Sequence, residues 1–461
     1  MSKPSTSPAR PEADIPLKRA ISRNLLLLLV VGDVLGAGIY ALVGEVGGRV
    51  GGAIWTAFLL ALTLALFTAF AYSELVTKYP QAAGAALYVN KAWRQPLFTF
   101  LVAFTVMCSG LTSAATLSRA FGGDYLSVFV DVPTVLVALL FITVVALVNF
   151  RGIAESVRLN VVLTSIELVG LLLVVIVGLA AIGEGGGSVD AGRALDFKEG
   201  ETVLLAIMGG AGLAFFALIG FEDSVNLAEE AENPSRNYPR AIFGGLLIAG
   251  AVYLLVTVVA SIVVPTDRLA GSSGPLLEVV QIGPLNLPTK LFSAIALFAL
   301  ANGALINMIM ASRLVYGMSR ERILPPALGR VHPTRQTPWV AIGATTALAM
   351  ILIVSGDLGD LADTTVLLLL LVFTAVNIAV LVLRRDDVPH EHFRAPTAIP
   401  AIGAVVSVAL MTTKDMETFA RAGGLIVLGL LLWLVNWWVH GRHVDPYVTE
   451  QLEVVERRDV S

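Results

Sequence analysis

Long apolar runs follow one another along the chain and are separated by short polar segments. A helix of about 20 apolar residues crosses the hydrocarbon core of a bilayer, so each run of that length predicts a membrane span. The runs are centred on residues 24–45, 52–76, 96–118, 133–150, 160–183, 203–225, 241–264, 288–312, 338–355, 361–383, 398–413 and 423–440. The pattern therefore predicts an all-α integral membrane protein with about 12 transmembrane helices, embedded in a lipid bilayer.

The composition of the 461 residues agrees with this class, because 56% are hydrophobic and only 14% are charged. The formal net charge of −4 is too small to imply a charged macromolecular partner, and no basic, aromatic-interleaved patch indicates nucleic-acid binding. Cys108 is the only cysteine, so no intrachain disulfide can form. The chain has no phosphate-binding, zinc-protease or Cys-x-x-Cys motif. We therefore expect no enzyme activity, no cofactor and no metal site.

Positively charged residues indicate the orientation, because Lys and Arg are retained on the cytoplasmic side. With the amino terminus inside, most of the 31 fall in predicted cytoplasmic segments. Residues 1–20 are polar and proline-rich, which predicts a disordered cytoplasmic tail and no cleavable signal peptide. Residues 441–461 are predicted to form a second cytoplasmic tail. We expect a multi-pass protein of the plasma membrane, with both termini cytoplasmic and a transmembrane domain over residues 21–440.

Two spans are interrupted by small residues in a way that marks the binding site of many transporters. They are the first, with Gly32, Gly36, Gly38 and Gly44, and the sixth, with Gly209, Gly210, Gly212 and Gly220. Because these spans are five apart, we expect two inverted repeats, over about 24–183 and about 203–383, followed by two extra helices over about 398–440. The alternative is that these glycines only allow neighbouring helices to pack closely.

The chemistry of such a site follows from the backbone that each interruption frees. Where a helix opens at Gly36 to Gly38, free N–H groups and the positive end of the next half-helix favour a carboxylate. Where the sixth span opens near Ala217 to Gly220, freed carbonyls can accept hydrogen bonds from an ammonium group. Together the two openings predict a site for an amino acid or a related organic amine.

Separated motifs in the chain also resemble a known family. They read GAGIY at 36–40, FFALIGFE at 215–222, AEEAENPSR at 228–236, ESVRLN at 155–160 and SRLVYGMSR at 312–320. With these motifs the chain resembles the amino acid/polyamine/organocation transporters, nearest to the cationic amino acid transporter type, over nearly all of residues 20–440. The resemblance implies a leucine-transporter-type fold of five plus five inverted spans, with broken helices 1 and 6, alternating access, and either coupling to protons or exchange.

The resemblance also implies roles for residues at the two breaks. The substrate carboxylate would lie on the amides of Ala37 and Gly38, beside Gly36, and the Val34 carbonyl would face the amino group. The carbonyls of Phe216, Ala217 and Ile219 would complete the ammonium site. Phe221 would be a gating aromatic, and Glu222 stands where relatives that handle cationic substrates are commonly acidic. Glu222 is open to a second interpretation, as a structural partner for backbone freed at the break.

Acidic residues inside the spans are costly, and each is a candidate functional group. Relatives linked to protons often carry a lysine where this chain has Glu167, so Glu167 is predicted either to bind a cation or to take up a proton. The alternative is a neutral Glu hydrogen-bonded inside the bundle. Asp33, about one helical turn before Gly36, is a second candidate for ion coupling. Asp223 is expected nearer the inner mouth, as a solvated or paired charge.

Other polar residues in the spans are weaker candidates. Asn302, Asn307, Ser109 and Ser113 can line a pathway, but hydrogen bonds between helices or to their own helix explain such residues at least as often. The loop after the third span contains no cysteine, so no disulfide-linked heavy subunit is expected.

Taken together, these patterns predict a secondary active transporter that imports an amino acid or related organic amine by alternating access, coupled to protons. Two alternatives stay open: an exchanger of amino acids or polyamines, and a membrane receptor that uses the same binding fold without transport.

Overall fold

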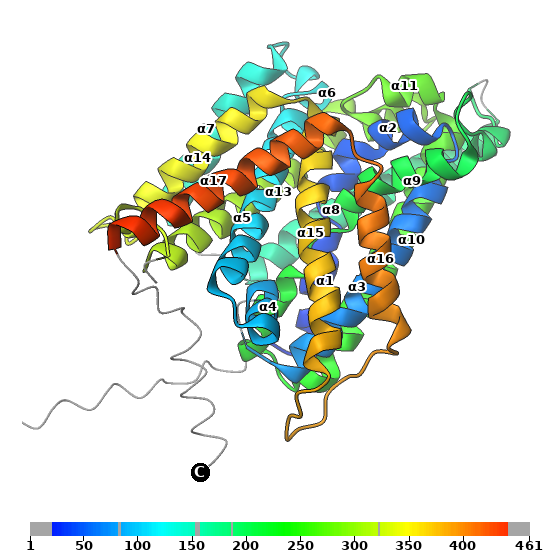
Figure 1. Ribbon diagram of the computed structural model, residues 1–461. Coiled ribbons are helices and arrows are strands. Elements are labelled where there is room, and N and C mark those ends of the chain that lie inside the picture. Colours follow the sequence, from blue (N-terminus) through cyan, green and yellow to red (C-terminus); the bar gives the residue numbers. More distant parts are fainter. Residues whose placement is uncertain (1–20, 82–83, 153–156, 186–187, 321–322, 441–461) are drawn as a thin grey trace, which may run out of the picture.

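The computed structural model describes residues 21–440 apart from 82–83, 153–156, 186–187 and 321–322 (Figure 1). The two predicted tails, 1–20 and 441–461, lie outside the described residues, as does the start of the 155–160 motif. Every named element within the described ranges is a helix, and the β-structure found there is a single bridge between Ile21 and Ala231. The prediction of an all-α protein is confirmed.

The helices of the described chain match the twelve predicted spans one to one. Eight spans are long and apolar enough to cross a membrane, and a bent pair of helices forms a ninth. The long ones are α3 (Ile54–Lys78), α5 (Pro96–Phe121), α8 (Val157–Glu184), α9 (Val203–Ala214) with its 3-10 continuation, α10 (Pro234–Val263), α13 (Thr289–Arg320), α15 (Leu358–Leu383) and α17 (Met416–His440). The bent pair is α1 (Arg23–Val34) with α2 (Gly38–Val50), and the remaining spans are the shorter apolar helices α7 (Thr134–Phe150), α14 (Trp339–Ser355) and α16 (Ala398–Met411).

Short helices connect or extend these spans. They are α4 (Gly84–Trp93), α6 (Asp124–Ser127), α11 (Thr266–Ala270) and α12 (Pro275–Ile282), together with the 3-10 helices η1 (Gly192–Leu195), η2 (Phe215–Leu218), η3 (Asp223–Glu230) and η4 (Pro326–Gly329).

The spans are helical because the hydrocarbon core of a bilayer offers no hydrogen-bond partners, and a helix satisfies its backbone polar groups within one segment. The side chains that face away from the bundle are accordingly apolar. On α7, Leu140, Val144 and Leu147 are each more than half exposed. Within the described chain, these outward faces form the surface that meets lipid tails.

Packing between the helices reflects the predicted relation of two halves. The second span, α3, packs against the seventh, α10, and the third, α5, packs against the eighth, α13. A twofold relation between spans one to five and six to ten brings these partners together. Helices α16 and α17 come after this core: α16 lies against α15 and α3, and α17 lies against α15 and α5 (Figure 1).

The two interrupted spans cross at their breaks, backbone against backbone. A Cβ added to Gly38 would lie 2.8 Å from the Cα of Ala217, and one added to Gly220 would lie 2.7 Å from the backbone oxygen of Asp33. Both predicted roles of these glycines are therefore fulfilled at once, since the same residues open the helices and let them approach closely.

A buried group of three charges ties the added helices to this core. The Asp363 carboxylate on α15 is 1% exposed and contacts the Arg49 guanidinium of α2 and the Lys414 ammonium, each at 2.5 Å. Lys414 follows α16, and a Cβ at Gly212 of α9 would lie 3.0 Å from its Nζ. Burial lowers the pKa of Lys414, and the neighbouring Asp363 carboxylate opposes that shift. One carboxylate therefore joins three parts of the chain.

Asp363→Ala is expected to destabilise the protein strongly. The change leaves the charges of Arg49 and Lys414 side by side without an anion, and loss of one partner of a buried ion pair costs about 3–5 kcal/mol. Thermal unfolding of the purified protein in detergent measures this effect. Glu417→Ala is the matched control, because the Glu417 side chain is 83% exposed and its pair with Arg421 contributes little. Equal melting temperatures for the two variants would contradict the structural role of Asp363.

Candidate binding site at the two helix breaks

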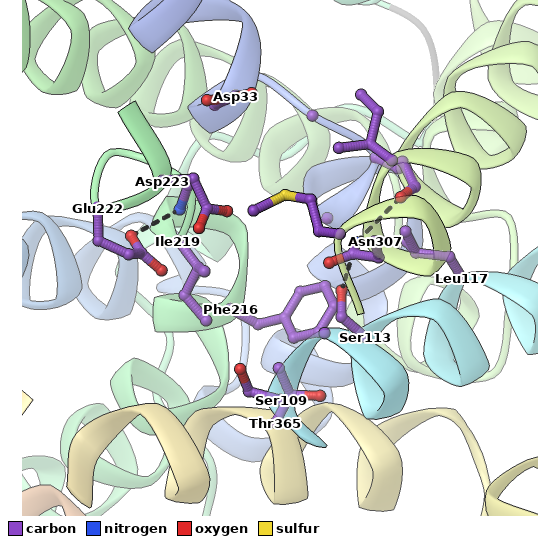
Figure 2. Close-up of a pocket in the computed structure, with 18 of the residues that line it drawn as sticks. Asp33, Ser109, Ser113, Leu117, Phe216, Ile219, Glu222, Asp223, Asn307 and Thr365 are labelled. Atoms are coloured by element: carbon purple, nitrogen blue, oxygen red, sulfur yellow. Dashed lines mark hydrogen bonds between the residues drawn. The ribbon is translucent and has the colours of Figure 1, made fainter. Parts of the chain in front are cut away.

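A cavity of about 120 Å³ lies where the two interrupted spans meet (Figure 2). Its walls come from α1, α2, α5, α8, α13 and α15, and from the segment that follows α9. In Figure 2, Glu222 and Asp223 lie on one side, Asn307 and Ser113 on the other, and Asp33 at one end. Helices from the first, third, fifth, eighth and tenth spans and the break of the sixth span therefore converge on one small space.

Ten of the eleven residues predicted for binding or ion coupling line this cavity. They are Asp33, Val34, Gly36, Ala37, Gly38, Glu167, Phe216, Ala217, Ile219 and Glu222. Phe221 does not line it: the side chain is fully buried, and its ring packs 5.8 Å from that of Tyr72 and 5.9 Å from that of Phe373. The gating role of Phe221 stays a prediction, while Phe216 is the neighbouring aromatic that reaches the cavity (Figure 2).

The first break exposes backbone groups of both kinds. Helix α1 ends at Val34, whose carbonyl accepts a hydrogen bond from the Tyr253 hydroxyl at 2.5 Å. Helix α2 begins at Gly38, and the Ala41 amide donates to the Ala37 carbonyl at 3.3 Å. The amides of the first turn of a helix lack partners within that helix. The start of α2 therefore presents N–H groups beside the cavity.

The second break is stabilised by its own side chain. After α9 and η2 the chain is extended at Ile219, and Gly220 adopts a φ of 125°, which only glycine takes readily. The Gly220 amide donates to Oε2 of Glu222 at 2.9 Å. The Glu222 carboxylate thus satisfies backbone that the break sets free, and it lines the cavity as well.

Glu167 lies on α8 opposite the first break. It is 1% exposed, and its Oε1 accepts a hydrogen bond from Nδ2 of Asn302 at 3.2 Å. No described group donates to its Oε2, and no ion pair of Glu167 occurs among the described residues. One carboxyl oxygen is therefore buried without a partner at the edge of the cavity.

Helix α8 contacts both halves of the broken first span. A Cβ at Gly32 of α1 would lie 2.3 Å from the hydroxyl of Thr164. On the other side, the Tyr40 hydroxyl of α2 donates to the Glu167 backbone carbonyl at 2.7 Å, and Gly170 leaves room for that hydroxyl. The α8 segment from Thr164 to Gly170 therefore contacts both half-helices of the first span.

Several lining residues were weak candidates in the sequence or were missed. Asn302, Asn307, Ser109 and Ser113 all line the cavity, and so does Asp223, which was expected nearer the inner mouth. Asn307 donates to the Ser113 hydroxyl at 3.2 Å and to the Gly303 carbonyl at 2.9 Å.

Gly110 and Gly303 were not considered, although both line the cavity. A Cβ at Gly303 would lie 2.8 Å from the Leu117 side chain, so α5 and α13 approach closely there. Gly110 lies in the third span and Gly303 in the eighth. These spans are five apart, as the two broken spans are, so a glycine in each of them is the sequence signal that could have indicated both residues.

A family model for amino acid permeases matches residues 24–414, from the first span to the end of the eleventh. The chain belongs to the amino acid permease family. It is a membrane transporter with the leucine-transporter-type fold and not an enzyme, which confirms the predicted family, fold class and transport function.

Curated relatives are similar over most of the chain. The branched-chain amino acid permease BcaP of Bacillus subtilis is 25% identical over 92% of this chain and 94% of its own length. The vacuolar cationic amino acid transporter 4 of Arabidopsis thaliana is 30% identical over 81% of this chain and 65% of its own. The methylthioribose transporter of Bacillus subtilis is 25% identical over 84% of this chain and 86% of its own length. These names span branched, basic and sugar-containing substrates, so similarity leaves the substrate of this permease open.

Gly38→Val is expected to abolish substrate binding in this permease. The added side chain meets the Ala217 backbone at the crossing of the breaks and fills the approach to the first turn of α2. Uptake of a panel of radiolabelled amino acids into proteoliposomes measures the effect, with a loss of at least tenfold expected. Gly209→Val is the matched control in the sixth span, because a Cβ there meets nothing within 4 Å. Normal uptake by the Gly38→Val variant would show that the first helix break is not part of the substrate-binding site.

Proposed function

We propose that this permease imports an amino acid or a related organic amine across the plasma membrane by alternating access, coupled to protons, with both termini in the cytoplasm. The observation that carries the proposal is that both helix breaks open onto one cavity beside a buried carboxyl group. Amides, carbonyls and a proton acceptor are the groups that a proton-coupled amino acid site needs.

The substrate carboxylate is assigned to the amides of Ala37 and Gly38, with Gly36 allowing close approach. The N-terminal end of α2 favours negative charge there, through its free N–H groups and its dipole. Among the described residues, no Lys, Arg or His lines the cavity and competes for this anion. The backbone amides at the start of α2 are therefore the proposed partners of the substrate carboxylate.

The substrate ammonium is assigned to the carbonyls of Val34, Phe216, Ala217 and Ile219. A carbonyl oxygen has two lone pairs, so Val34 can accept from the Tyr253 hydroxyl and from the substrate together. The tyrosine then holds that carbonyl in place. Phe216 lines the same cavity (Figure 2), and its ring is assigned to the apolar part of the substrate.

Proton coupling is assigned to Glu167, and Asp33 is proposed as a second ion-coupling group. An ionised carboxylate with one unpartnered oxygen is costly in a buried site, so protonation of Glu167 stabilises the state seen here. The Tyr40 contact links the backbone of Glu167 to α2, where the substrate carboxylate binds. Proton uptake and substrate binding thereby act on the same pair of half-helices.

The membrane topology and assembly belong to the same proposal. The distribution of Lys and Arg favours cytoplasmic termini. Cys108 is buried inside the third span and is unsuited to a disulfide with another chain. The permease is therefore proposed to work without a disulfide-linked partner subunit.

Glu167→Gln is expected to uncouple transport. The amide cannot take up the proton, yet it keeps the shape and an acceptor for Asn302, so substrate binding is expected to change by less than about threefold. Accumulation driven by an inward proton gradient in proteoliposomes is expected to fall by about tenfold or more. Glu184→Gln, an exposed position at the end of the same helix, is the control.

Unchanged gradient-driven accumulation in the Glu167 variant would remove the coupling role. If uptake does not depend on the proton gradient but requires an amino acid inside the vesicle, the protein is an exchanger and not a proton-coupled importer. Saturable binding without any flux would replace transport by a receptor function.

A further inference from the structure

A basic patch lies at the end of the bundle that the proposed function assigns to the cytoplasm. It consists of Arg151 after α7, Arg320 at the end of α13, and Arg330 and Arg335 in the loop from α13 to α14. All four residues are exposed, and none of them lines the substrate cavity. The basic patch is therefore separate from the site at the helix breaks.

Close backbone approaches bring these arginines together. A Cβ added to Gly152, the residue after Arg151, would lie 3.6 Å from the backbone oxygen of Arg335. A Cβ added to Gly329, in the same loop, would lie 3.8 Å from the backbone nitrogen of Arg320. The ends of α7 and α13 and the loop before α14 therefore meet, and each contributes positive charge to one surface.

The loop that carries two of these arginines is held against both helices. The Thr337 hydroxyl donates to the Phe150 carbonyl at 3.0 Å, which ties the loop to the end of α7. The ring of His332 packs edge-on against that of Phe150 at 5.2 Å, and the His332 amide donates to the Thr337 carbonyl at 2.9 Å. The Ser319 hydroxyl donates to the Pro325 carbonyl at 2.8 Å, which ties the loop to the end of α13. The basic patch is thus a built surface.

The charge of the basic patch is poorly balanced. Residues 313–342 include five arginines and one acidic residue, Glu321, which lies outside the described residues, and residues 134–152 include one arginine and no acidic residue. Among the described residues, no guanidinium of the basic patch forms an ion pair or a hydrogen bond. Like charges repel one another, and a planar guanidinium pairs with a phosphate through two parallel hydrogen bonds. The basic patch therefore favours a phosphate ligand.

The basic patch lies where the lipid-facing surface of the bundle ends. Helices α7 and α14 pack against each other (Figure 1). Leu147, near the end of α7, is 57% exposed, and Trp339, the first residue of α14, is 48% exposed. Tryptophans at the ends of spans lie at the level of the lipid headgroups. A Cβ added to Gly343, one turn into α14, meets nothing within 4 Å, which leaves room for an acyl chain.

We infer that the basic patch binds the phosphate headgroup of an anionic membrane lipid, with the acyl chains against the outer faces of α7 and α14. Clusters of four or more basic residues at the end of a membrane helix attract anionic lipids, by about fivefold in affinity per charge. The depth of Trp339 and the open surface at Gly343 favour a lipid over a soluble phosphate. This inference goes beyond the proposed function, because it does not depend on the substrate.

Native mass spectrometry of the full-length permease tests the inference. Detergent micelles that contain equal amounts of phosphatidylglycerol and phosphatidylcholine, with the same acyl chains, supply the two lipids. The wild type is expected to retain phosphatidylglycerol at least about fivefold over phosphatidylcholine. The triple variant Arg151→Gln/Arg330→Gln/Arg335→Gln is expected to reduce this preference to about twofold or less. Its melting temperature without added lipid is expected to stay within about 2 °C of the wild type, because exposed side chains without partners contribute little to stability.

Arg236→Gln/Arg240→Gln/Arg385→Gln is the matched control, since it removes three exposed arginines from other segments at the same end of the bundle. It is expected to keep the preference for phosphatidylglycerol. Equal retention of both lipids by the wild type, or an unchanged preference in the variant of the basic patch, would overturn the inference. Equal losses in the two triple variants would also overturn it, because the lipid would then respond to overall charge. Displacement of phosphatidylglycerol by millimolar glycerol phosphate would instead identify a site for a soluble phosphate.

Discussion

The structure depends on one constraint, which is that backbone polar groups need partners wherever the bilayer excludes water. Two helices that break at membrane depth expose several such groups, and each break meets the other where they cross. Gly38 lies on Ala217, and Gly220 lies on the backbone of Asp33. The groups left over by this crossing face a cavity, and in the proposed function a zwitterionic substrate supplies the missing donors and acceptors. On that proposal, substrate binding follows from how the backbone of the breaks is satisfied.

Side chains around the crossing also satisfy backbone polar groups near the two breaks. Tyr253 donates to the last carbonyl of α1, Tyr40 donates to the Glu167 carbonyl, and Glu222 accepts the Gly220 amide. The Glu222 carboxylate stabilises the interrupted backbone, and the same residue also lines the cavity where the substrate is proposed to bind. The two interpretations of this residue are compatible.

The sequence predicted the spans, the two breaks and most of the lining, because each depends on local composition. Apolar length defines a span, and Gly36 to Gly38 or Gly220 marks an opening without reference to other helices. The orientation of Phe221 was not predictable in this way, since the positive φ of Gly220 turns that side chain into the core beside Tyr72. Asp223 lines the cavity, and its expected position nearer the inner mouth stays a prediction. The Arg49–Asp363 pair and the Tyr253–Val34 hydrogen bond join residues 314 and 219 positions apart, and no pattern in one span indicates them.

The central claim is that an amino acid occupies the cavity at the crossing of the two breaks. Its most direct test is the rate at which a methanethiosulfonate reagent modifies Ser113→Cys, a near-isosteric change in the lining, with the buried Cys108 replaced by serine. The best-transported amino acid of the uptake panel is expected to slow this modification by at least tenfold at saturation. It is expected to leave Gly343→Cys, at an open position on α14, unaffected. Equal rates of modification at Ser113→Cys with and without the amino acid would contradict the account.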